Sequence, residues 1–183
     1  MSGLKTVAVD AIPGTWVIDV PVMRDDRGTF VKTFQTSWLE NLGCKFELRE
    51  EFFSESAAGV LRGMHFQTPP ADHQKIVSCT AGRVLDVLLD LRRGENYGRS
   101  WSIELDADQP RMMLIPRGVA HGFLSLQTGS VMVYKTDHEY APEFDAGIAH
   151  DSFGFDWPPV DGGPRMSDRD QQHPNLSDWE TPF

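Results

Sequence analysis

The feature that most constrains the fold is a two-residue alternation of apolar and polar side chains in residues 83–92, RVLDVLLDLR. The apolar positions are Leu85, Val87, Leu89 and Leu91, and the intervening polar positions are Asp86, Asp90 and Arg92. Successive side chains of a β-strand point to opposite faces, whereas an α-helix repeats every 3.6 residues. The alternation therefore predicts a β-strand with one apolar face.

Seven further short runs have the composition of β-strands and are separated by segments rich in glycine, proline, aspartate and asparagine. They cover residues 46–53, 59–67, 75–80, 100–105, 111–116, 122–127 and 130–138. Eight or so strands at this spacing indicate a sandwich or a barrel, so we predict an all-β, cupin-like jelly-roll barrel.

Outside these strands the sequence predicts little regular structure. Residues 36–43, TSWLENLG, indicate a short helix with Thr36 or Ser37 as its N-cap and Gly43 at its end. The Pro- and Asp-rich sequence after about residue 140 predicts an extended C-terminal region with a turn or two. Because 183 residues is within the usual size of one domain, we predict that residues 1–183 form a single domain.

Charge and composition exclude several classes of partner. The net charge of −10 and the isoelectric point near 4.9 disfavour nucleic acid, whose phosphate backbone the protein would repel. No apolar run approaches the roughly 20 residues that span a bilayer, and residues 1–16 lack the apolar block of an export signal. Cys44 and Cys79 form no CxxC pair. We therefore expect a cytoplasmic protein that binds neither nucleic acid nor membranes.

The histidines of the strand region raise the question of a metal. In PRGVAHGF the spacing of Pro116, Gly118 and His121 resembles the second motif of the cupin superfamily, whose metal-binding members also have an H-x-H pair. Here that segment reads HFQ, with Gln67 in place of the second histidine. His65 and His121 are only two ligands, whereas zinc and iron sites need three or four, and His73 lies in a loop. We expect no metal and no other cofactor.

A longer set of motifs is more specific. The chain contains RDDRGTF, GVLRGMHFQ, QKIV, RVLDVLLDLR, YGRSW, IPRGVAHGF, YKTDHEYAPEFDAGI and MSDRD. In this order and spacing, from about residue 20 to residue 178, the chain resembles the dTDP-4-dehydrorhamnose 3,5-epimerase family. The resemblance implies a metal-free, cytoplasmic jelly-roll homodimer that acts on nucleotide-linked 4-keto-6-deoxy sugars.

Epimerisation beside a ketone requires a base, a group that holds the enolate oxygen and an acid that returns a proton to the opposite face. The resemblance implies that His65 is the base and Tyr134 is the acid. It also implies that Asp170 orients His65 and that Lys75 stabilises the enolate. From the residues alone, Tyr134 is equally compatible with a core aromatic, and Asp170 with a solvated charge or a helix cap.

The resemblance also supplies ligands for the rest of the substrate. Arg27 and Arg62 would bind the pyrophosphate, and Gln67 would be a further substrate contact. His121 would face the sugar hydroxyls, and Tyr140 would stack on the nucleobase. Strict alternation places Arg62 and His65 on opposite faces of one strand, so joint contact with a ligand requires a bulge or twist at Gly63.

The positions that contact the nucleotide depart from the family pattern. Lys32 and Asp145 replace glutamates, Glu50 and Phe52 replace a Gln-x-Asn pair, and Arg169 replaces a lysine. Because guanine offers an acceptor at O6 and donors at N1 and N2, Lys32 and Glu50 together could read guanine instead of thymine. GDP is therefore a candidate nucleotide beside dTDP.

Other functions remain open from the sequence. One is an isomerase that moves the keto group, although family members of that kind carry different histidine patterns. A metal-dependent cupin oxygenase and a non-catalytic sugar-binding cupin are the remaining alternatives. Four other histidines are interpreted as surface or structural residues: His73, His138, His150 and His173.

Overall fold

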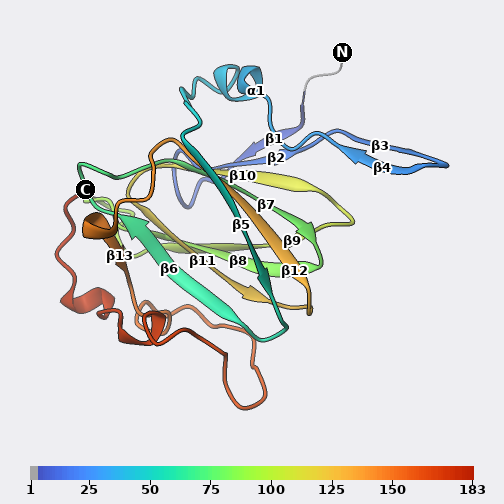
Figure 1. The fold of residues 1–183 in the computed structure, drawn as a ribbon. Helices are drawn as coiled ribbons and strands as arrows, with labels where there is room; N and C mark the ends of the chain where they lie inside the picture. The colour runs from blue at the N-terminus through green and yellow to red at the C-terminus, as the bar shows by residue number, and fades with distance from the viewer. Residues whose placement is uncertain (1–3) are drawn as a thin grey trace.

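The computed structural model describes residues 4–183, which fold into two antiparallel β-sheets that face each other (Figure 1). The six-stranded sheet has the order β1 (Thr6–Ala8), β2 (Trp16–Asp19), β10 (Arg111–Ile115), β7 (Lys75–Ala81), β12 (Ser130–Thr136) and β5 (Glu50–Ser56). The five-stranded sheet has the order β13 (Asp145–Gly147), β6 (Leu61–Gln67), β11 (Val119–Ser125), β8 (Arg83–Asp90) and β9 (Ser100–Asp106). This is the predicted all-β jelly-roll architecture.

The eight predicted strands are all present, and five short strands were not predicted. Of the five, β3 (Val22–Asp25) and β4 (Gly28–Val31) form a separate hairpin that extends away from the two sheets (Figure 1). The others are β1, β2 and β13, which lie at or beside sheet edges. Strands of three or four residues carry too little alternation to be recognised in a sequence.

The predicted helix is shorter than expected and has a different cap. It forms α1 (Thr36–Glu40), and its N-cap is Gln35, which has an extended backbone. The prediction of Thr36 or Ser37 as N-cap was wrong. The Gln35 side chain donates a hydrogen bond to the Ser37 hydroxyl at 2.6 Å, so that hydroxyl lies inside the first helical turn.

The apolar core has three layers. The central layer fills the space between the sheets and includes Leu88, Met113 and Phe123. A second layer lies on the outer face of the six-stranded sheet, where Leu39 of α1 packs. The third layer lies on the outer face of the five-stranded sheet and includes Leu89. Strand β8 is therefore buried on both faces, and Asp86, on the face that the sequence marks as polar, is fully buried.

The extended C-terminal region covers the outer face of the five-stranded sheet (Figure 1). Its only helical turns are three short 3-10 helices: η1 (Pro142–Phe144), η2 (Asp170–Gln172) and η3 (Leu176–Asp178). Phe66 of β6 anchors it by edge-on contacts with Trp179 and Phe183. Within residues 4–183, no helix is long and apolar enough to cross a membrane.

Strand β6 contains a bulge at Gly63, as joint contact of Arg62 and His65 with one ligand requires. His65 pairs with His121 of β11, but Arg62 pairs with Phe123, so Gly63 and Met64 together oppose the single residue Gly122. A Cβ at Gly63 would lie 2.5 Å from the Gly122 Cα, and the Gly63 backbone has a positive φ of 141°. Only glycine fits there. This bulge turns Arg62 and His65 to the same side of the sheet.

Candidate active site

A cavity of about 370 Å³ opens between the two sheets. Strands β6 and β11 of one sheet and β5, β7 and β12 of the other line it. Most of the residues selected from the sequence meet here. Those that line the cavity are Glu50, Phe52, Arg62, His65, Gln67, Lys75, His121, Tyr134, Tyr140, Asp145 and Arg169.

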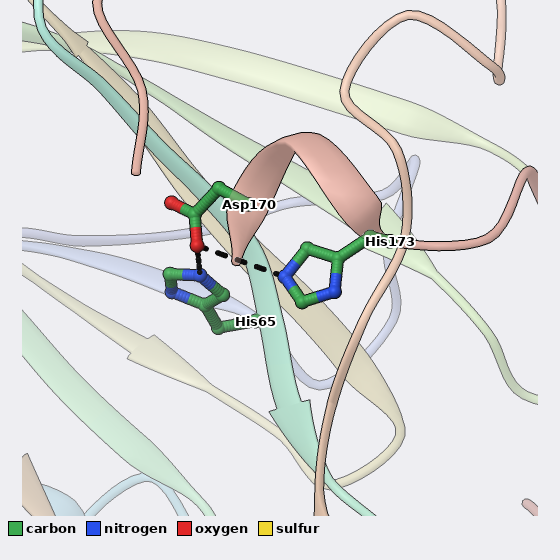
Figure 2. Close-up of side chains that lie close together, drawn as sticks. All are labelled: His65, Asp170 and His173. Atoms are coloured by element: carbon green, nitrogen blue, oxygen red, sulfur yellow. Dashed lines mark hydrogen bonds and ion pairs between the residues drawn. The ribbon is translucent and has the colours of Figure 1, made fainter. Parts of the chain in front are cut away.

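His65 and Asp170 form a hydrogen-bonded pair at one wall of the cavity (Figure 2). The His65 Nε2 lies 2.8 Å from the Asp170 Oδ1, and the Gly63 amide donates to the other carboxylate oxygen at 3.3 Å. His65 is 31% exposed, whereas Asp170, behind it at the start of η2, is only 5% exposed. The imidazole therefore faces the cavity and the carboxylate is shielded.

The environment fixes the protonation of this pair. Burial alone would raise the pKa of Asp170, but the ring nitrogens of His173 and His65 and the Gly63 amide outweigh burial and lower it strongly. Burial lowers the pKa of His65, and the charge of Lys75 lowers it further, against the opposing effect of Asp170. Asp170 is thus a carboxylate that can only accept, so His65 carries its proton on Nε2 and has a free lone pair on Nδ1.

Lys75 lies beside His65 on strand β7. Its ammonium group donates to the His65 backbone carbonyl at 3.0 Å, and the residue is 9% exposed. Burial lowers the pKa of Lys75 to about 8, partly offset by the negative charges of Asp145 and Asp86. At neutral pH, Lys75 is mostly a buried cation, which can stabilise a negative oxygen.

Tyr134 lies on β12, in the sheet opposite His65. Its ring stacks on Phe52 at a centroid distance of 4.7 Å, and its hydroxyl lies 3.3 Å from the Ser54 hydroxyl. Burial raises the pKa of Tyr134, although the hydrogen bond with Ser54 lowers it. The phenol therefore stays protonated at neutral pH and can donate a proton.

A second histidine–aspartate pair lies deeper, between β11 and β8. The His121 Nε2 lies 2.8 Å from the Asp86 Oδ2, and the two side chains are 4% and 0% exposed. Burial raises the pKa of Asp86, although His121 and Lys75 oppose the shift. The Asp86 Oδ1 has no hydrogen-bond partner within residues 4–183. No functional role was predicted for Asp86, because an acid at an alternating strand position resembles a solvent-exposed one.

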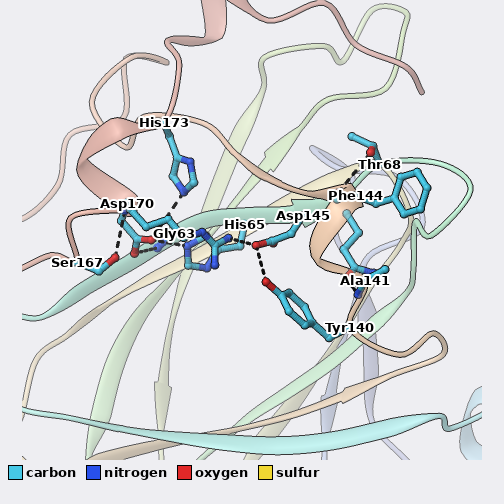
Figure 3. A network of polar contacts seen from close by, with 12 residues as sticks. Gly63, His65, Thr68, Tyr140, Ala141, Phe144, Asp145, Ser167, Asp170 and His173 are labelled. Atoms are coloured by element: carbon cyan, nitrogen blue, oxygen red, sulfur yellow. Dashed lines mark hydrogen bonds and ion pairs between the residues drawn. The ribbon is translucent and has the colours of Figure 1, made fainter.

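Four of the residues at the positions that contact the nucleotide in the family make contacts within this chain. Glu50 accepts a hydrogen bond from the Tyr140 amide at 2.8 Å, and the Tyr140 hydroxyl donates to Asp145 at 3.1 Å (Figure 3). Arg169 forms an ion pair with Asp145 at 2.6 Å. These contacts fix the exposed Tyr140 ring at the rim of the cavity, and Phe52 stacks on Tyr134.

Two further residues on β6 have distinct surroundings. Arg62 donates to the Ser56 hydroxyl at 3.1 Å and to the Glu55 carbonyl at 3.2 Å, on the same side as His65. Gln67 is buried and holds the neighbouring loops, since it donates to the Ala71 carbonyl at 2.8 Å and accepts from the Ala141 amide at 2.7 Å. Gln67 thus shapes the cavity through the backbone.

Arg27 and Lys32 do not reach the cavity of their own chain. Arg27 lies in the turn of the β3–β4 hairpin, 86% exposed, and pairs with Asp25 at 2.6 Å. Lys32 follows the hairpin and donates to Gln35 at 3.3 Å. The structure therefore does not bring Lys32 and Glu50 together within one chain.

Three of the histidines interpreted as surface or structural residues adjoin the site. His73 and His138 line the cavity, and His73 lies 3.1 Å from the Gln67 amide nitrogen. Burial, together with the charge of Lys75, lowers the pKa of His73 to about 3, so it is neutral. His173 is buried beside Asp170 (Figure 2). In the sequence, only its spacing of three residues from Asp170 could have indicated that His173 lies at the site.

The potential metal ligands do not have the cupin arrangement. Gln67 and His121 are both engaged with other groups. Across residues 4–183, the one group of three or more His, Cys, Asp or Glu side chains with ligand atoms within 4.8 Å of one another consists of His65, Asp170 and His173.

Comparison with known proteins finds relatives along nearly the whole chain. Residues 10–178 match the model of the family described as dTDP-4-dehydrorhamnose 3,5-epimerase. The enzyme of that name from Mycobacterium tuberculosis is 37% identical over 177 residues, which cover 91% of this chain and 85% of that protein.

Solved structures give the same result. The 3,5-epimerase from Legionella pneumophila, in complex with dTDP-4-keto-L-rhamnose, has a TM-score of 0.91 at 30% identity and covers 97% of this chain and 95% of that one. ChmJ, a 3'-monoepimerase from Streptomyces bikiniensis in complex with dTDP-quinovose, has a TM-score of 0.86 at 29% identity and covers 93% of this chain and 88% of that one.

Proposed function

Because the chain belongs to the dTDP-4-dehydrorhamnose 3,5-epimerase family, we propose that it is an isomerase of dTDP-linked 4-keto-6-deoxy sugars. The reaction inverts C3, C5 or both by proton transfer beside the C4 ketone, through an enolate. The Legionella and Streptomyces proteins are in complex with dTDP-4-keto-L-rhamnose and dTDP-quinovose, which are both dTDP-linked 6-deoxy sugars.

The observation that carries the proposal is the placement of a base and an acid on opposite walls of one cavity. His65 lies on β6 of the five-stranded sheet, and Tyr134 lies on β12 of the six-stranded sheet. Inversion of a carbon requires that a proton leaves one face and returns to the other. A sugar held between the two sheets meets both groups at once.

The protonation states also suit the reaction. The free lone pair on the His65 Nδ1 removes the carbon-bound proton, and the Asp170 carboxylate stabilises the imidazolium that forms. The Lys75 ammonium compensates the negative charge that develops on the C4 oxygen. The Tyr134 hydroxyl then donates a proton to the opposite face of the carbon.

The remaining contacts orient the substrate. Arg62, on the same side of β6 as His65, is placed to bind the diphosphate, for which a guanidinium fork is well suited. His121, held by Asp86, meets the sugar hydroxyls. Tyr140 offers an exposed ring at the rim for the nucleobase, and Glu50 holds its backbone. Glu50 thus has a structural role that does not require guanine.

We also propose that two copies of the chain form a dimer in which Arg27 and Lys32 serve the partner's site. The β3–β4 hairpin exposes Met23 and Phe30, each 57%, and the edge strand β5 exposes Phe53, 70%. Burial of these apolar side chains favours association. Light scattering should give twice the mass of the chain, with Phe30→Asp weakening the dimer. A monomer at all concentrations would exclude this assembly.

The function is tested by deuterium incorporation from D₂O into dTDP-, UDP-, CDP- and GDP-linked 4-keto-6-deoxy sugars, counted by mass spectrometry. Two deuterons indicate 3,5-epimerisation and one indicates mono-epimerisation. We expect the dTDP-linked sugars to react fastest. A clear preference for the GDP-linked sugar would assign Glu50 and Lys32 to reading guanine, and no incorporation into any sugar would exclude the epimerase.

A further inference from the structure

The His173 imidazole occupies a fitted niche beside the catalytic pair. It packs against Gly147 of β13, where an added Cβ would lie 2.3 Å from the imidazole Nε2. The side chain is 9% exposed, and its Nε2 has no hydrogen-bond partner within residues 4–183. This nitrogen lies 3.7 Å from the Asp170 carboxylate, too far for a hydrogen bond, and a buried polar atom left in this way indicates a place for a ligand.

The atoms around this niche match a metal site. The Asp170 Oδ1 lies between two ring nitrogens, 2.8 Å from the His65 Nε2 and 3.7 Å from the His173 Nε2 (Figure 2). Bonds of about 2.0–2.2 Å in a tetrahedron place neighbouring ligand atoms roughly 3.3–3.6 Å apart. The three ligand atoms lie within 4.8 Å of one another, so rotations of the two rings would bring them to that spacing. The other carboxylate oxygen keeps its hydrogen bond to the Gly63 amide.

We propose that His65, Asp170 and His173 form a three-ligand site for a divalent transition-metal ion, Zn²⁺ in particular, and that the bound ion switches the enzyme off. Two imidazoles and a carboxylate are a ligand set that zinc accepts, and a water molecule would complete the tetrahedron. The ion is an inhibitor here and not a cofactor, because it occupies the catalytic base.

Inhibition follows from the tautomer of His65 and rests on the proposed function. A metal bound at Nε2 requires the lone pair of that nitrogen, so the imidazole proton moves from Nε2 to Nδ1. The Nδ1 that faces the sugar then carries a hydrogen and cannot remove a proton from carbon. The number of protons on the residue is unchanged.

The test measures metal binding without substrate. The purified protein is titrated with Zn²⁺ against a chromogenic chelator and with Co²⁺, whose absorption spectrum reports tetrahedral coordination. We expect one ion per chain. His173→Gln and His173→Ala should each weaken binding by at least about tenfold, the lower end of what loss of an outer-sphere partner costs. His150→Ala, a histidine packed on Trp157, is the matched control.

Deuterium exchange with and without Zn²⁺ then measures inhibition relative to each variant's own metal-free rate. Wild type should lose activity and regain it with a chelator, and the His173 variants should resist zinc. Equal zinc affinity in wild type and both variants, or no binding by wild type below about 1 mM, would overturn the site. Zinc binding by a protein that exchanges no proton would leave the site standing and remove the epimerase function instead.

Discussion

The two histidine–aspartate pairs have the same hydrogen-bond length and opposite surroundings. His65 faces the cavity, and Asp170 is held as an anion by ring nitrogens and the Gly63 amide. His121 is almost fully buried, and burial raises the pKa of Asp86. The same histidine–aspartate distance is therefore not enough to make a base. An imidazole needs an accessible nitrogen and a stabilised anion behind it.

The largest expected effect comes from removing the accessible imidazole. His65→Asn keeps a polar side chain of similar reach but has no basic nitrogen, so deuterium exchange should fall by about 10³-fold or more, within the range for a general base. Mass spectrometry of the sugar measures it, and circular dichroism checks the fold. Exchange at the wild-type rate would remove His65 from the base role.

The second prediction compares the exchange rates of two variants in which one aspartate of each pair is replaced by asparagine. Asp170→Asn removes the anion that stabilises the His65 imidazolium, and exchange should fall by about 10²-fold or more. Asp86→Asn keeps the shape of a side chain that does not contact His65. The exchange rate of this variant should therefore fall by no more than about tenfold. Equal losses in the two variants would contradict the distinction between the pairs.

Tyr134→Phe tests the acid on the opposite wall, against which the His121 ring packs edge-on. Without the phenol, His65 should still remove and return the carbon-bound proton, so exchange persists. Completed inversion should fall by about 10²-fold, as expected for loss of a general acid. The measurement follows deuterium content and stereochemistry of the same sugar. Normal inversion would assign the acid elsewhere.

The smallest effect concerns the pH profile of kcat/KM, which should be bell-shaped. Activity falls at low pH as His65, whose pKa is lowered, becomes protonated, and it falls above about pH 8 as Lys75 loses its proton. Asp170 raises the pKa of His65, so Asp170→Asn should move the acidic limb to lower pH. Asp86 raises the pKa of Lys75, so Asp86→Asn should move the alkaline limb to lower pH. Shifts on the opposite limbs would contradict this assignment.

Much of the fold could be predicted from the sequence, because the principal strands alternate strongly enough to be recognised. The bulge at Gly63 was also accessible, because Arg62 and His65 could share a ligand only through it. The burial of Asp86 was not, since alternation distinguishes two faces without saying that both are covered. Here the C-terminal region covers the second face.

The site was predicted less evenly. Asp170 lies 105 residues from His65, and no periodicity links positions so far apart, so only the family motifs connected them. His173 follows the short helix η2 in an extended segment, where a single histidine carries no pattern. Lys32 and Arg27 were predicted as ligands from the same motifs, yet both lie outside the cavity of their own chain.

The bulge on β6 fixes the distance between Arg62, which is placed to bind the diphosphate, and His65, which removes the proton. Arg62 and His65 are separated by backbone and not by a hinge, so the span from the diphosphate to the reacting carbon is set by the fold. A sugar 1-phosphate lacks the second phosphate and the nucleoside, so it offers Arg62 one phosphate in place of two and leaves the Tyr140 ring without a nucleobase. We expect it to bind more weakly than the nucleotide-linked sugar, because it loses these contacts.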